Sequence, residues 1–245
     1  MLVVAGCSSD SDDKKDAEAS ASPSAEKSEP SVEPAKFATL PEPCNSISEK
    51  TTKSLVPKAQ NKAGTQGTSS DVAARGSCSW NGLDDNGVKG SQYRWLDVGF
   101  SRFDSDQALG SGAKRATDHY TKQIAKVEAT EDAEKLAAKP VSGIGEQATA
   151  IAYDLSKTSE DFKYATIVAR TGNVVVTLTY NGAGYAGAKT PSASDILEGA
   201  EKAAKEAVAS VATAGAGDGK TPAEPSGKPT DKSSAKDDSK ADSKA

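Results

Sequence analysis

Amino-acid composition is very uneven along this 245-residue chain, and this unevenness limits where a core can form. Residues 8–36 are almost entirely Ser, Asp, Glu, Lys, Ala and Pro, and residues 213–245 contain no Leu, Ile, Val, Phe or Tyr. Segments of this kind bury too little apolar surface to offset the entropy lost on ordering. We therefore expect a disordered tether over residues 8–38, a folded domain over residues 39–212 and a disordered C-terminal tail over residues 213–245.

The charge distribution argues against a nucleic-acid partner. The chain carries 35 acidic and 30 basic residues, and the tether holds most of the acidic excess, so the domain itself is nearly neutral. A protein that binds DNA or RNA concentrates Lys and Arg in order to neutralise several phosphates. The domain sequence shows no such excess, and we expect no nucleic acid among its partners.

The first seven residues resemble a bacterial lipobox. Met1–Cys7 reads MLVVAGC, in which aliphatic residues and two small residues precede a cysteine, and the polar tether follows at once. In this pattern the chain is cleaved before the cysteine, whose sulfur takes a diacylglyceryl group that holds the protein on the membrane. A positively charged n-region and a full-length apolar run are both missing, which a translation start upstream of Met1 would explain. We interpret residues 1–7 as a truncated signal peptide with lipidation at Cys7; the alternative is a soluble protein that matches by chance.

Three cysteines are an odd number for an exported protein, in which cysteines usually pair. Lipidation of Cys7 removes the odd one and leaves Cys44 and Cys78. In an oxidising compartment these two are expected to form a disulfide. The alternative is a pair of buried reduced thiols in a cytosolic protein.

Helix and strand signals alternate through the domain and predict an α+β fold. Antiparallel strands with helices packed on one face of the sheet are the expected arrangement. The expected elements are a short helix capped by Asn45 or Ser46 and ending near Leu55, a loop over 60–75, strands at 77–83 and 92–103, a helix over 105–128 capped by Asp104 or Ser105, a loop at 140–145, a strand at 146–155, a hairpin of 164–170 with 174–180, and a last helix opened by Ser192 or Ser194.

The order of several short motifs resembles a family of secreted actinobacterial lipoproteins, domain of unknown function 3558. The motifs are the lipobox, the polar tether, Pro43-Cys44 before a short helix, Cys78-Ser79-Trp80, Gly143–Ala148, and the hairpin that contains Arg170–Val174. A more distant likeness is to the extracytoplasmic sensor domains of receptor kinases. The resemblance implies a curved antiparallel sheet, a lipid anchor at Cys7, a Cys44–Cys78 disulfide and no established enzymatic activity.

Three further motifs suggest ligand chemistry but fit a structural role better. Gly143–Ala148 matches G-x-G-x-x-A, yet a loop precedes it and a strand follows, whereas a dinucleotide site needs a strand before and a helix after. His119 is the single histidine and falls on the polar face of a predicted helix. Asp84–Asn86 lacks the remaining ligands of a calcium loop and is typical of a hairpin turn. We expect no metal and no cofactor.

Two other residue sets leave alternatives open. A hydrolase would need two carboxylates at a catalytic separation, and four acidic residues are expected near strand ends: Asp97, Asp104, Glu146 and Asp154. Four aromatic residues, Tyr93, Trp80, Trp95 and Phe100, are interpreted as sheet core in preference to a stacking platform for sugars. The leading expectation is a non-enzymatic extracytoplasmic domain that binds or senses an envelope protein or a small ligand. The alternatives are a small-molecule or lipid carrier with an internal cavity, and an envelope hydrolase.

Overall fold

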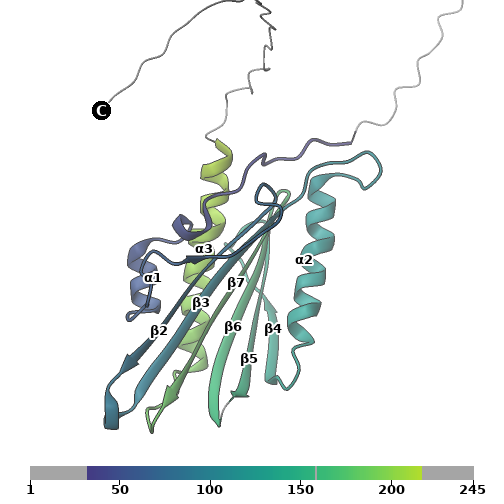
Figure 1. The fold of residues 1–245 in the computed structure, drawn as a ribbon. Helices are drawn as coiled ribbons and strands as arrows, with labels where there is room; N and C mark the ends of the chain where they lie inside the picture. Colours follow the sequence, from purple (N-terminus) through teal and green to yellow (C-terminus); the bar gives the residue numbers. More distant parts are fainter. Residues whose placement is uncertain (1–31, 158, 217–245) are drawn as a thin grey trace, which may run out of the picture. The chain divides into compact units, whose positions relative to one another are not determined.

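The computed structural model describes residues 32–157 and 159–216, which form one α+β domain (Figure 1). In chain order the elements are η1 (Pro43–Asn45), α1 (Glu49–Leu55), β1 (Thr65–Gln66), β2 (Arg75–Asp85), η2 (Gly87–Lys89), β3 (Ser91–Arg102), α2 (Gly112–Glu128), β4 (Glu134–Pro140), β5 (Gln147–Lys157), β6 (Glu160–Thr171), β7 (Val174–Tyr185) and α3 (Ala193–Ala216). The predicted fold class is confirmed. None of the helices in these residues is long and apolar enough to cross a bilayer.

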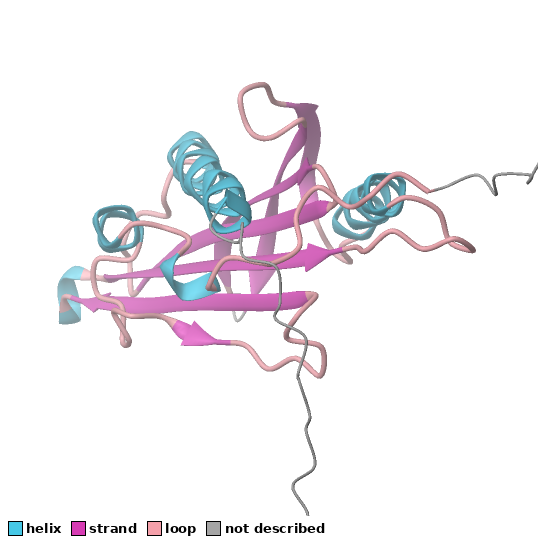
Figure 2. Cartoon of the chain, turned by 90° about the horizontal axis from the view of Figure 1, so that it is seen from above, coloured by secondary structure: helices cyan, strands magenta, loops and turns pink. Residues whose placement is uncertain are grey.

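The strands described form a single curved antiparallel sheet in the order β1-β2-β3-β7-β6-β5-β4 (Figure 2). Both predicted strand pairs are confirmed and are longer than predicted: β2 pairs with β3 from Arg75 to Asp85, and β6 with β7 from Lys163 to Thr171. Gly172 has φ +54° in the two-residue turn after β6, a conformation that glycine adopts without strain. β3 and β7 pair along the whole length of β3 and place the two hairpins side by side.

The helices lie on both faces of the sheet, whereas the sequence predicts them on one. Helix α3 packs on strand residues such as Ile167 and Leu178, together with α1, and this side is called the α3 face. Helix α2 packs through Ala116 on Ile151 and Val168, whose side chains point to the opposite side, called the α2 face. The two helices stand on different sides of the strands in Figure 2.

Both faces are covered because the central strands are apolar on both sides. Neighbouring residues such as Ile167 and Val168 are fully buried, and so are Val174, Val175 and Val176. Such continuous β-branched runs are typical of strands that are buried on both faces. A strand with one exposed face would show alternating apolar and polar residues. The apolar run is visible in the sequence. Which helix covers the odd-numbered side chains of a strand, and which covers the even-numbered ones, depends on the fold.

Several element boundaries differ from the predicted ones. Ser48 caps α1, because its hydroxyl accepts a hydrogen bond from Thr51 N at 3.3 Å, and Ser111 caps α2 in the same way. Helix α2 therefore begins later than predicted. Strand β4 was not predicted; it is an exposed, bulged edge strand without β-branched residues. Strand β1 lies in the predicted loop.

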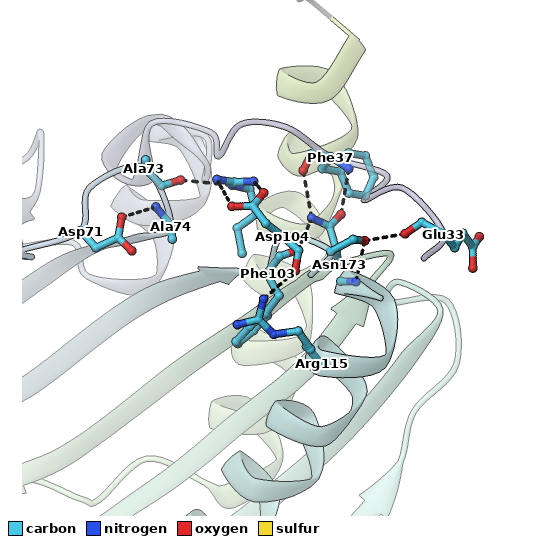
Figure 3. Close-up of polar contacts among 12 residues, drawn as sticks. Glu33, Phe37, Asp71, Ala73, Ala74, Phe103, Asp104, Arg115 and Asn173 are labelled. Carbon is cyan, nitrogen blue, oxygen red and sulfur yellow. Dashed lines mark hydrogen bonds and ion pairs between the residues drawn. The ribbon is translucent and has the colours of Figure 1, made fainter. Parts of the chain in front are cut away.

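The folded part begins before the predicted boundary at residue 39. Phe37 is 6% exposed and joins the core, held by Asn173: the Phe37 amide donates to Oδ1 at 2.8 Å, and Nδ2 donates to the Phe37 carbonyl at 2.9 Å (Figure 3). Nδ2 also donates to the Phe103 carbonyl at 2.9 Å. Nearby, the Ser105 hydroxyl donates to the Glu33 carbonyl at 2.5 Å. Residues 32–37 thus form a strap across one end of the sheet, and the rest of the predicted tether lies outside the described residues.

Both ends of the described chain lie at the strap. The Phe37 ring is so close to the last turn of α3 that a Cβ at Gly215 would lie 2.5 Å from it. Helix α3 ends at Ala216, past the predicted boundary, and the remainder of the predicted tail is outside the described residues. Figure 1 shows the start of the described chain and the C-terminal end of α3 at the same end of the domain.

Candidate ligand-binding cavity

A cavity of about 580 Å³ lies on the α3 face at the end away from the strap. It is open to solvent on one side and is lined by the C-terminal end of α1, the ends of β2, β3 and β7, and the N-terminal end of α3. The lining residues are Ser54, Leu55, Val56, Pro57, Lys58, Gly82, Asp84, Gln92, Arg94, Tyr180, Lys189, Thr190, Pro191, Ser192, Asp195 and Ile196. Arg94 lies eight residues before the strap end of β3, which corresponds to roughly 25 Å along the strand.

Arg94 occupies the sheet side of this cavity between two glycines. In the strand register, Gly82 of β2 and Gly182 of β7 lie directly beside Arg94 of β3. A Cβ at Gly182 would lie 2.9 Å from Arg94 Cδ, and a Cβ at Gly82 would lie 2.4 Å from the Lys58 carbonyl. The two glycines therefore leave room for the arginine side chain and for the turn after α1. Arg94 Nη1 donates to the Tyr93 carbonyl at 2.7 Å.

Tyr180 joins the sheet to α1 at the cavity wall. Its hydroxyl donates to the Leu55 carbonyl at 2.8 Å. Burial raises the pKa of Tyr180, while the neighbouring Arg94 guanidinium acts in the opposite direction. The phenol thus stays protonated at neutral pH and keeps the last turn of α1 in place above Arg94.

The cavity lining carries more positive than negative charge. Lys58, Arg94 and Lys189 contribute three cations against Asp84 and Asp195, and the N-terminus of α3 adds partial positive charge. The Ser192 hydroxyl caps α3 by accepting from the Asp195 amide at 3.0 Å. A guanidinium in such a pocket suits a carboxylate or phosphate, which it binds through two parallel hydrogen bonds.

The carboxylates considered for a hydrolase do not meet. Asp104 pairs with Arg102, Glu146 with Lys36 and Arg170, and Asp154 with Lys135 and Lys163. Burial acts to raise the pKa of Glu146 and of Asp154, but hydrogen bonds outweigh it and lower both pKa values: those from Gly172 N and Lys36 at Glu146, and those from Lys163 and Lys135 at Asp154. Asp104, Glu146 and Asp154 are each engaged by their own basic partners, and Asp97 points to the α2 face, so the four form no catalytic pair.

Asp97 is the exception among these groups, because it has no hydrogen bond or ion pair with any described residue. Burial raises its pKa to about 6. The folded state therefore binds the proton more tightly than the unfolded chain, whose aspartates titrate near 3.9. The ionised carboxylate lowers stability above pH 6, and this effect disappears below about pH 4.

We expect Asp97→Asn to raise the free energy of unfolding by about 1–2 kcal/mol at pH 7, a value discounted for partial exposure. At pH 4 the difference should shrink to about 0.5 kcal/mol or less, because the carboxyl is then protonated in the folded state and about half protonated in the unfolded chain. Urea unfolding of both proteins at the two pH values measures this. A difference that is the same at pH 4 and pH 7 would contradict the assignment to ionisation.

The remaining motifs have structural roles. His119 lies on α2, 5.0 Å from the Phe103 ring centroid, and burial and nearby cations lower its pKa. Gly145 turns the chain with φ +64° into strand β5, so no helix follows the G-x-G pattern. Asp85 accepts hydrogen bonds from Gly87 N and the Ser91 hydroxyl within the β2–β3 turn. The described residues contain no His, Cys, Asp and Glu group suited to a metal ion.

The predicted disulfide is present, with a Cys44–Cys78 S–S distance of 2.08 Å, and it ties η1 to β2. Cys7 lies outside the described residues. Of the aromatic residues, Trp80 and Phe100 are core residues, each 2% exposed, whereas Tyr93 and Trp95 are only half-buried. A hollow between α1 and Trp80 measures about 80 Å³, which is too small for a lipid.

The sequence prediction missed Arg94, Tyr180 and the cavity. No family model, curated protein or solved structure matches the chain. The resemblance to the lipoprotein family therefore remains a prediction.

Proposed function

We propose that the chain is a lipid-anchored cell-envelope protein whose extracytoplasmic domain binds a small anionic molecule in the Arg94 cavity, without catalysing a reaction on it. The observation that carries the binding proposal is the position of the Arg94 guanidinium. It lies in a cavity of about 580 Å³, beside two glycines that leave it room.

The placement of the cavity fits anchoring through Cys7. The chain enters the domain at Val32, at the strap, while the cavity lies at the other end of β3. A tether attached at the strap would leave the cavity end free to face away from a membrane. The Cys44–Cys78 disulfide fits an oxidising compartment outside the cytoplasm.

The chemistry of the lining favours a ligand with one carboxylate or phosphate and a small polar body. Arg94 would hold the anionic group, and Lys58 and Lys189 would add longer-range attraction. Asp84 and Asp195 on the same lining would exclude ligands of high negative charge, because each would repel a second anionic group. The cavity is of the size that small ligands occupy.

Binding should be tested with a panel of small carboxylates and phosphates, from acetate and glutamate to glycerol phosphate, by calorimetry and NMR titration. We expect at least one member of the panel to bind. Arg94→Gln should weaken this binding by about tenfold or more, because the substitution removes a charge-assisted hydrogen-bonded pair. Arg75→Gln is the matched control, since Arg75 is an exposed arginine at the strap end of β2. Absence of binding across the panel, or equal binding by Arg94→Gln, would refute the anion site.

A further inference from the structure

Some strands have no covering element on the α2 face. Helix α2 packs on β5, β6 and the strap ends of β3 and β7, and in Figure 1 it leaves most of β2 and β3 uncovered. Two rows of the strand register define the uncovered area: Ser79, Asp97 and Thr179 in one row, and Asn81 and Trp95 in the next. Each of these five residues is partly exposed, and together they are called the open face.

Asp97 is the one charged residue on the open face. It is half-buried and makes no hydrogen bond or ion pair with any described residue. The Thr179 hydroxyl beside it is bonded to Thr166 at 3.0 Å. A carboxylate in this position is costly to the folded protein unless a positive group reaches it.

Aromatic rings border the carboxylate on the same side of the sheet. Trp95 precedes Asp97 by two residues, is half-buried and belongs to neither buried hydrophobic cluster. Beyond it, Tyr93 packs edge-on against Phe162, with ring centroids 5.9 Å apart. A cation over the indole face and beside a carboxylate gains both a cation–π contact and a charge-assisted hydrogen bond.

We propose that the open face docks a partner protein that presents an arginine or lysine side chain to Asp97, with Trp95 stacking on it. Charge complementarity favours this occupant, because one unpaired negative group lies in an otherwise uncharged face. The position favours a protein over a small ligand: the five residues lie on three adjacent strands, and none of them lines the Arg94 cavity or the hollow beside Trp80, whereas small-ligand sites are concave. Trp, Tyr and Arg are also the residues that most often dominate protein interfaces.

The open face and the Arg94 cavity are independent sites. Arg94 and Trp95 are neighbours on β3, and their side chains point to opposite faces of the sheet. The cavity carries an excess of positive charge and the open face a negative one. Either proposal can therefore fail without the other.

The probe is an acetylated, amidated Ala-Arg-Ala peptide, with the citrulline peptide as its uncharged analogue, titrated into the ¹⁵N-labelled domain. We expect the arginine peptide to shift the amide signals of the open face and the Trp95 indole signal. The citrulline peptide should bind at least tenfold more weakly. Asp97→Asn and Trp95→Ala should each weaken the binding of the arginine peptide by a similar factor. Asp161→Asn, an exposed aspartate of β6, is the control and should bind like the native protein.

Four results would overturn the proposal. These are no shift on the open face, equal binding of the citrulline peptide, unchanged binding by Asp97→Asn, and a neutral oligosaccharide shifting the same signals in that variant. The last would assign the face to a glycan. The oligomeric state of the protein is measured separately by sedimentation. If the native protein is a dimer and Asp97→Asn dissociates it, the open face binds a second copy of the chain.

Discussion

Asn173→Ala is expected to lower the free energy of unfolding by about 3–5 kcal/mol. The side chain of Asn173 is fully buried and makes three hydrogen bonds, to both backbone groups of Phe37 and to the Phe103 carbonyl. Alanine would leave all three partners unsatisfied, each at about 1–3 kcal/mol before water reaches some of them. It would also release the strap, so that Phe37 loses its place in the core.

Urea unfolding measures this loss, and hydrogen exchange of the Phe37 amide shows whether the strap has opened. Asn86→Ala, at the exposed turn after β2, is the control and should change stability by less than about 0.5 kcal/mol. Asn173→Asp should lose at least as much stability as Asn173→Ala at neutral pH, because the buried carboxylate keeps the acceptor for the Phe37 amide but faces two carbonyl oxygens. A loss below about 1 kcal/mol for Asn173→Ala would show that the strap is not held through this residue.

Loss of the disulfide is the second large effect. The Cys44–Cys78 bond closes a loop with a sequence separation of 34 residues. In the chain-entropy model such a crosslink stabilises the folded state by about 3–4 kcal/mol through the unfolded chain. We expect the double variant Cys44→Ser, Cys78→Ser to lose about this much, with further loss because Cys78 is fully buried.

Reduction supplies the matched comparison. The native protein unfolded in dithiothreitol should approach the stability of the double variant, whereas the double variant itself should be insensitive to the reductant. Equal stability of the native protein with and without reductant would contradict a stabilising role for this bond.

Much of the fold was predictable because local signals were strong. The β6–β7 hairpin carries β-branched runs on both sides of Gly172-Asn173, and α3 carries a continuous stripe from Ile196 to Val211. Strand β4 was not predicted because Glu134–Pro140 is exposed and has no strand-forming residues. The strap was missed because Phe37 follows a polar segment, and its partner Asn173 lies more than a hundred residues away.

The cavity could not be predicted for a similar reason. Arg94 lies in an alternating strand, where a single arginine is typical of a solvent-facing position. Its room comes from Gly82 and Gly182, and only the register of three strands places these beside it. Asp97 was recognised as a candidate acid, but its isolation depends on which part of the sheet α2 covers.

Two properties of Asp97 point in the same direction. Burial raises its pKa to about 6, so its ionised form is expected to lower the stability of the folded state at neutral pH, and it has no hydrogen bond or ion pair with any described residue. Groups that cost stability in this way are often retained for binding. The stability comparison in the Asn variant and the peptide titration therefore examine one residue by two independent measurements.

The proposed lipid anchor is tested most directly by the intact mass and detergent phase partitioning of the native protein isolated from its own membranes. We expect a species that begins at Cys7, carries added diacylglyceryl mass and enters the detergent phase. An unmodified chain that begins at Met1 and stays in the aqueous phase would contradict the proposal.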